Sequence, residues 1–319
     1  MKRMAALLLG GWISLTAHAD DDWEALQEEW RFVAREAQLL LEQTPEDDWW
    51  ARASLAVLMH PYTGSLLEWE RLAVSALRNQ QPEQLRAAAV ATPQGASTRL
   101  RQRLFEAWMA DQPDNLAPAL SHALLAGGNV LDRLGDVSRF ERHDHALFAT
   151  AERLSKALPE ATPVPISFTY EDDGVAQASD MVWVSLMGMA AGNLSPLFSC
   201  LDRQVVGQLA SQDQKSCLAI GQRLETSSTL LIDNQLGLAM QRLVHEAIGD
   251  QAAAQAGRQR SEQITHLISS VHPDVGHDRE QLERWRAKLV KHGELGALRW
   301  LEENCDDFDS SASCLLASD

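Results

Sequence analysis

The chain has 319 residues, of which 45% are hydrophobic, and a formal net charge of −17 at neutral pH. This acidity repels the phosphates of nucleic acids and anionic lipid surfaces, so we expect neither as a partner. The length and the apolar content suffice for one large hydrophobic core or two smaller ones.

Residues 1–19 have the three parts of a cleavable secretory signal peptide. Lys2 and Arg3 give a positive start, 4–16 form an apolar run, and Ala17-His18-Ala19 places small residues before the expected cleavage point. The run is shorter than the ~20 residues that cross a bilayer. No cysteine lies directly after Ala19, where a lipid anchor would be attached. The sequence therefore predicts a periplasmic or secreted protein without a membrane span. Loss of Lys2 and Arg3 would move the net charge from −17 to −19.

Helical periodicity dominates the chain after the signal peptide. Apolar residues recur at three- and four-residue spacing, and prolines and glycines separate the periodic segments. The helices are expected over 23–41, 47–58, 66–77, 82–90, 100–109, 115–125, 140–158, 175–191, 197–209, 217–224, 229–248, 252–271, 280–290 and 295–301. Pro61 is expected to stop the second of these helices. The predicted fold class is therefore all-α.

The stretch 159–174 interrupts this pattern, because it contains three prolines and the acidic turn Glu171-Asp172-Asp173-Gly174. We interpret it as a linker or long loop between two helical halves, 20–158 and 175–304. The remaining residues, 305–319, form a tail rich in Asp and Ser without a helical stripe.

Four cysteines remain in a chain expected to reach an oxidising compartment, and this predicts disulfides. Three pairings are possible, of which we favour the sequence-local pairs Cys200–Cys217 and Cys305–Cys314. A metal site is disfavoured at these positions because there is no C-x-x-C and no histidine at ligand spacing.

One helix junction has a recognisable pattern. Phe105-Glu106-Ala107-Trp108 is followed by Asp111-Gln112-Pro113-Asp114-Asn115, in which Pro113 stops one helix and Asn115 caps the next. This junction resembles that of tetratricopeptide-like repeats over about residues 100–130, and the whole chain resembles exported bacterial helical-repeat proteins. The resemblance implies antiparallel helix pairs in an array or superhelix, and it implies no enzymatic activity. No 34-residue period recurs along the chain.

Two groups of residues have the types that bind metals or move protons. Glu141, His143 and His145 lie at the start of an expected helix, where His143 and His145 would point to different faces and only Glu141 and His145 would share one. The favoured interpretation is a solvated helix start. His272 and His277 lie in a Pro- and Gly-containing loop with two aspartates, and an ordinary turn is the favoured interpretation.

The adjacent indoles of Trp49 and Trp50 could present a flat surface to a partner. On a helix they diverge by about 100°, so we expect one in the core and one partly exposed.

No nucleotide-binding or hydrolase motif occurs in the chain, and we predict no catalytic residue, no cofactor and no metal. The leading hypothesis is a non-enzymatic interaction or scaffold protein of the cell envelope, with a protein or peptide partner. The alternative is an exported hydrolase or metal-dependent enzyme with a His/carboxylate site. Convergence of two of the four named histidines with a carboxylate would favour the enzyme. The oligomeric state is left open.

Overall fold

The computed structural model describes residues 20–63, 66–93, 95–163, 177–191, 198–270 and 279–303. The expected signal peptide, Cys305, Cys314, His272 and His277 lie outside the described residues, as does most of the loop 159–174. No helix among the described residues is both long enough and apolar enough to cross a membrane.

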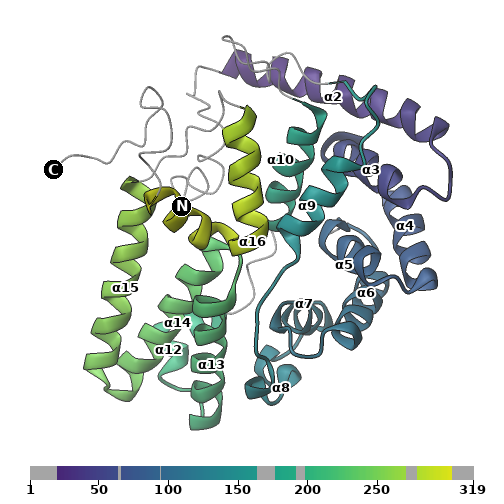
Figure 1. The fold of residues 1–319 in the computed structure, drawn as a ribbon. Coiled ribbons are helices and arrows are strands. Elements are labelled where there is room, and N and C mark those ends of the chain that lie inside the picture. The colour runs from purple at the N-terminus through teal and green to yellow at the C-terminus, as the bar shows by residue number, and fades with distance from the viewer. Residues whose placement is uncertain are drawn as a thin grey trace. The chain divides into compact units, whose positions relative to one another are not determined.

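Every regular element within these ranges is a helix, so the protein is all-α as predicted (Figure 1). The helices are α2 (Asp20–Gln43), α3 (Trp49–Thr63), α4 (Leu66–Asn79), α5 (Pro82–Ala91), α6 (Thr98–Asp111), α7 (Leu116–Ala126), α8 (Val130–Leu134), η1 (Val137–Arg139), α9 (Leu147–Lys156), α10 (Ala178–Ala191), α11 (Phe198–Leu201), α12 (Arg203–Val206), α13 (Ser211–Ser227), α14 (Leu231–Ile248), α15 (Gln251–Ser270) and α16 (Arg279–Glu303). The expected stop at Pro61 is wrong, because α3 continues to Thr63.

The chain divides into two compact units that are each built from three separate segments. Unit 1 contains Met1–Trp108, Ala146–Gly192 and Val275–Arg286, and unit 2 contains Met109–His145, Asn193–Asp274 and Ala287–Asp319. This division differs from the two consecutive halves expected on either side of residues 159–174. The reason is that helices distant in sequence bury their apolar faces together within each unit.

In unit 1, α2 packs on α3, and α9 and α10 pack on each other and on α3. Trp49 is buried in this core, and its indole N–H donates to the carbonyl of Leu72 at 3.0 Å. Trp50 is half-buried and meets Trp49 edge to face, with the ring centroids 4.9 Å apart. Only Trp50 therefore retains a face that a partner could reach.

The junction before α7 forms as its sequence indicates. α6 ends at Asp111, and Asn115 is the N-cap of α7, where its Oδ1 accepts the Ala117 N–H at 3.2 Å. The cap satisfies one of the backbone donors that a helix start leaves unpaired.

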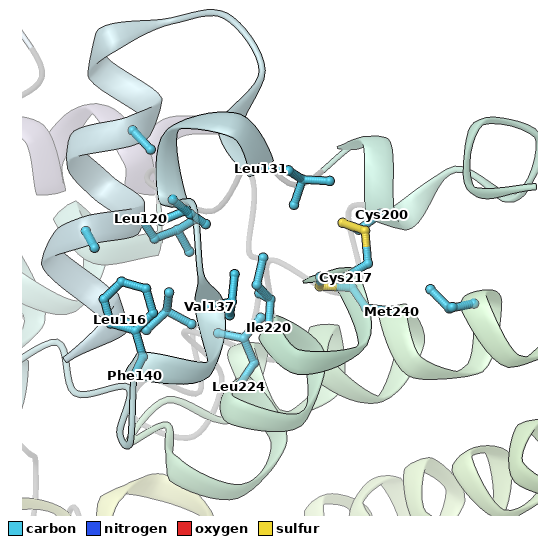
Figure 2. Packing of buried hydrophobic residues seen from close by; sticks show 14 of the residues in the cluster. Leu116, Leu120, Leu131, Val137, Phe140, Cys200, Cys217, Ile220, Leu224 and Met240 are labelled. Carbon is cyan, nitrogen blue, oxygen red and sulfur yellow. A yellow bond between two sulfur atoms is a disulfide. The ribbon is translucent and has the colours of Figure 1, made fainter. Parts of the chain in front are cut away.

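The core of unit 2 joins α7, α8 and η1 to α11, α12, α13 and α14 (Figure 2). Phe140, Leu116 and Leu134 are among its most deeply buried side chains. The Cys200–Cys217 disulfide lies in this core, as predicted, and links α11 to α13 across a separation of 17 residues.

Two glycines allow α13 and α14 to approach closely. A Cβ atom on Gly221 would lie 2.8 Å from the carbonyl oxygen of Gly237, and a Cβ on Gly237 would lie 2.6 Å from the Glu225 nitrogen and closer still to the Gly221 oxygen. These contacts involve backbone atoms, which cannot rotate away. The close approach holds α14, the helix that contains Asp233, against α13.

We expect Gly237→Ala to destabilise the protein by about 2 kcal/mol, because overpacking against a neighbouring backbone typically costs 1–3 kcal/mol. Urea unfolding followed by circular dichroism measures the change. Gly257→Ala is the matched control, since its added Cβ would make only ordinary contacts at 3.7 Å and a helical alanine is favoured over glycine. Equal stability of the two variants would contradict the proposed close packing.

Candidate functional site

The segment 140–146 is not helical, so the predicted helix over 140–158 is wrong in its first part. α9 begins at Leu147, and the residues before it hydrogen-bond to the junction that precedes α7. The carbonyl of Asp114 accepts the N–H groups of Glu141 at 2.9 Å and Arg142 at 3.3 Å, and the Leu116 N–H donates to the Arg142 carbonyl at 2.9 Å. These long-range bonds replace the intrahelical bonds that the local sequence favours.

Side chains reinforce the same attachment. The Asn115 amide donates to the carbonyl of Asp144 at 2.9 Å and accepts the Asp144 N–H at 3.0 Å, in addition to capping α7. The Arg142 guanidinium binds both carboxylate oxygens of Asp114, at 3.1 and 3.2 Å. The segment is therefore held at fixed positions along its length.

This conformation brings His143 and His145 together. In extended backbone, residues two apart lie on the same side, whereas on a helix they diverge. The two Nε2 atoms lie 3.0 Å apart, and the rings meet edge to face with centroids 4.6 Å apart. The expected helix, on which His143 and His145 would point to different faces, does not form here. Glu141, expected to be the partner of His145, is exposed and stands apart from the pair.

Asp233, in the first turn of α14, completes the cluster. Its Oδ2 lies 2.6 Å from Nε2 of His145 and 3.1 Å from Nε2 of His143. The Ser228 hydroxyl donates to the same Oδ2 at 2.9 Å, and Ser228 forms a parallel bridge with His143. Sequence reasoning missed Asp233, because an acidic residue in a first helical turn is favoured by the helix dipole alone and gave no further signal.

The cluster is buried on one side and open on the other. The side chains of His143 and Asp233 are 1% and 3% exposed, whereas that of His145 is 25% exposed. The expectation of a solvated His143 is therefore wrong. Among the three side chains, that of His145 is the most exposed.

The environment separates the proton affinities of the three groups. Burial lowers the pKa of His143 below its ordinary value. Burial acts in the same direction on His145, but the charge and hydrogen bond of Asp233 outweigh it and raise the pKa of His145. Burial alone would raise the pKa of Asp233; the charge of His145 and the hydrogen bonds of both histidines hold it well below its usual range.

The arrangement fits three ligands on one face of a metal ion. Among the described residues, His143, His145 and Asp233 form the group whose potential ligand atoms all lie within 4.8 Å of one another. Ligand atoms ~2.1 Å from an ion lie about 3.0 Å apart at a right angle and about 3.4 Å apart at a tetrahedral angle. Two of the observed separations, 3.0 and 3.1 Å, match the right-angled case, and the third, 2.6 Å, is shorter.

A cavity of about 1050 Å³ in unit 2 adjoins this cluster through Ser228. Ser228 lines the cavity and also donates to Asp233. Most other lining residues are polar or charged, among them Arg260, Glu262, His266, His292, Arg299 and Glu302. Ile264, Leu267 and Leu295 add apolar surface to the same lining.

Comparison with known proteins returns no matching family model, no matching curated protein and no matching solved structure.

In protein freed of metal with EDTA, we expect His145 to titrate above the ordinary histidine pKa of about 6.5, and His143 below it. A raised folded-state pKa contributes stability that is complete below about 6.5 and is lost as the pH rises through the folded value. Histidine NMR shifts measured against pH test this. Asp233→Asn should lower the pKa of His145, whereas the control Asp250→Asn should leave it unchanged; the reverse result would contradict the pairing.

Proposed function

We propose that His143, His145 and Asp233 bind a divalent transition-metal ion and that this chain is an exported metal-dependent hydrolase. The observation that supports it is the convergence of two imidazole nitrogens and one carboxylate oxygen, 2.6 to 3.1 Å apart, in a partly buried site. Two histidines and one carboxylate are a common ligand set of catalytic zinc and of non-haem iron.

Three protein ligands on one face leave the remaining coordination positions to water and substrate. A bound ion of this kind lowers the pKa of its water and polarises a substrate oxygen. His143 would anchor the ion from the buried side, while the partly exposed His145 borders the side open to solvent. Ser228 would keep Asp233 oriented by donating to the oxygen that faces the histidines.

We also propose that the chain is periplasmic or secreted, with its helices arranged as tetratricopeptide-like antiparallel pairs. The signal-like start of the sequence and the Cys200–Cys217 disulfide support export, because structural disulfides persist in oxidising compartments. The packing of successive helices, α13 on α14 and α14 on α15, supports a paired arrangement (Figure 1).

EDTA-treated protein should bind one equivalent of Zn²⁺ or Co²⁺, measured by calorimetry and by metal analysis after desalting. We expect His143→Ala, His145→Ala and Asp233→Asn each to weaken the affinity by roughly 100-fold or more, since ligand loss should exceed the 10–100-fold cost of losing an outer-shell partner. His245→Ala, in the last turn of α14 whereas Asp233 is in the first, is the histidine control and should bind as the wild type does.

Unchanged binding in the variant lacking all three groups would contradict the proposed centre. With binding established, hydrolysis of ester, phosphoester and peptide probes should require added metal and disappear in Asp233→Asn. Metal binding without metal-dependent turnover of any probe class would count against the hydrolase and retain only the metal centre.

We infer a scaffold protein with a protein or peptide partner as the second candidate function. It is favoured by the accessible face of Trp50, whose ring is contacted by the Arg153 guanidinium at 5.2 Å, and by the exposed Phe32 and Leu67 of the same unit.

An affinity pull-down from envelope extract with the mature chain tests this second function. A scaffold should retain a specific protein, lose it on Trp50→Ala, and keep it when His143, His145 and Asp233 are all replaced. Trp49 is unsuitable for this test, because it is 4% exposed and belongs to the core. Retention of no specific protein, or loss only in the metal-site variant, would contradict the scaffold.

A further inference from the structure

The helix that contains Asp233 obtains its N-terminal cap from a distant part of the chain. Its N-cap residue, Leu230, has no side chain that can accept a hydrogen bond. The Leu231 N–H donates instead to Oε2 of Glu294 in α16, at 2.6 Å. The Leu230 N–H donates to the Ser228 hydroxyl at 3.1 Å, so both of these backbone donors have partners.

A break in α16 makes this capping possible. Gly293 has φ 69° and ψ −179°, which interrupts the helix and directs Glu294 toward the turn before α14. The Glu294 N–H also donates to the carbonyl of Thr229 at 2.8 Å. A Cβ atom at Gly293 would lie 2.7 Å from both Cα and the carbonyl oxygen of Thr229. Glycine is thus required here both by the positive φ and by the contact.

The stretch 228–233, which Glu294 contacts, contains Asp233 of the proposed metal centre and its hydrogen-bond partner Ser228. Ser228 donates to Oδ2 of Asp233, and Leu231 lies two residues before Asp233. Residues 228–233 are therefore held between two attachments, with the histidine segment 141–145 on one side and Glu294 on the other. Displacement of Leu231 would move Asp233 relative to the histidines.

A glutamate at this position carries an energetic cost, because its carboxylate is buried. Burial raises the pKa of Glu294 to about 7, and the negative charge of Asp233 acts in the same direction. The N-terminus of α14 partly offsets this cost, because a helix start favours a negative charge.

We propose that Glu294 is a positioning residue of the metal centre: it caps α14 at Leu231 and so fixes Asp233 at ligand distance from His143 and His145. The inference rests on the proposed metal site. It adds α16, through Gly293 and Glu294, to the parts of the chain that determine metal affinity.

The test compares Zn²⁺ affinity and the visible spectrum of the Co²⁺ form at pH 8 for full-length variants. Glu294→Ala removes the acceptor and should weaken Zn²⁺ binding by about tenfold or more, the low end of the range for groups that orient a ligand, and should shift the Co²⁺ bands. Glu294→Gln keeps an amide oxygen that can accept the Leu231 N–H, so it should recover most of the affinity.

Gly293→Ala is a second, independent disruption, since it displaces Glu294 without removing its carboxyl group. It should reproduce the loss seen in Glu294→Ala. Glu303→Ala, an exposed position on the same helix, and Gly257→Ala are the matched controls and should bind as the wild type does. Circular dichroism establishes that each variant compared is folded.

A purely structural cap would lower the unfolding midpoint of Glu294→Ala and leave the Zn²⁺ affinity and Co²⁺ spectrum of the folded protein unchanged. That outcome would overturn the positioning role alone. Absence of metal binding by the wild type would overturn the proposed metal centre itself, so the two failures are distinguishable. If Glu294→Ala does not fold, Gly293→Ala decides: wild-type affinity in that folded variant would also overturn the positioning role.

Discussion

The hydrogen bonding of residues 141–145 to the start of α7 is the interaction on which the candidate site depends. Backbone groups of Glu141 and Arg142 pair with the junction at Asp114, and the Asn115 amide holds Asp144 on both sides. With these backbone groups satisfied, the segment needs no helical bonds of its own. It stays non-helical, and this allows His143 and His145 to lie next to each other.

A buried carboxylate requires a compensating positive charge, and this requirement organises the rest of the cluster. Asp233 is 2% exposed, and it is surrounded by two imidazoles and a hydroxyl. A proton on His145 or a divalent cation between the three groups can supply that charge. The charge of Asp233 favours the proton and so raises the pKa of His145. A bound cation would instead use the same nitrogen and oxygen atoms as its ligands. Metal binding and protonation therefore compete at this site.

Much of the fold could be predicted, because helical periodicity and helix caps are local properties. The end of α6 at Asp111 and the cap at Asn115 follow from Pro113 and from an asparagine side chain that reaches its own helix start. The same local reasoning failed at 140–146, where bonds to residues almost 30 positions away outweigh helix propensity. It also gave no reason to select Asp233 among many acidic residues, since its role depends on partners 88 and 90 positions away.

The sequence by itself determined the helical class and the position of the α6–α7 junction, because each depends on residues close together along the chain. It favoured the Cys200–Cys217 pairing among three possible ones, and the structure decided it. Only the tertiary structure decided which acidic residue meets His143 and His145, and which glutamate caps α14. Those pairings bring together 141–145, the first turn of α14 and the break in α16, three segments far apart in the sequence. Their meeting follows from burial of the unit 2 core and from the glycines that permit close backbone contact, and no local pattern encodes that.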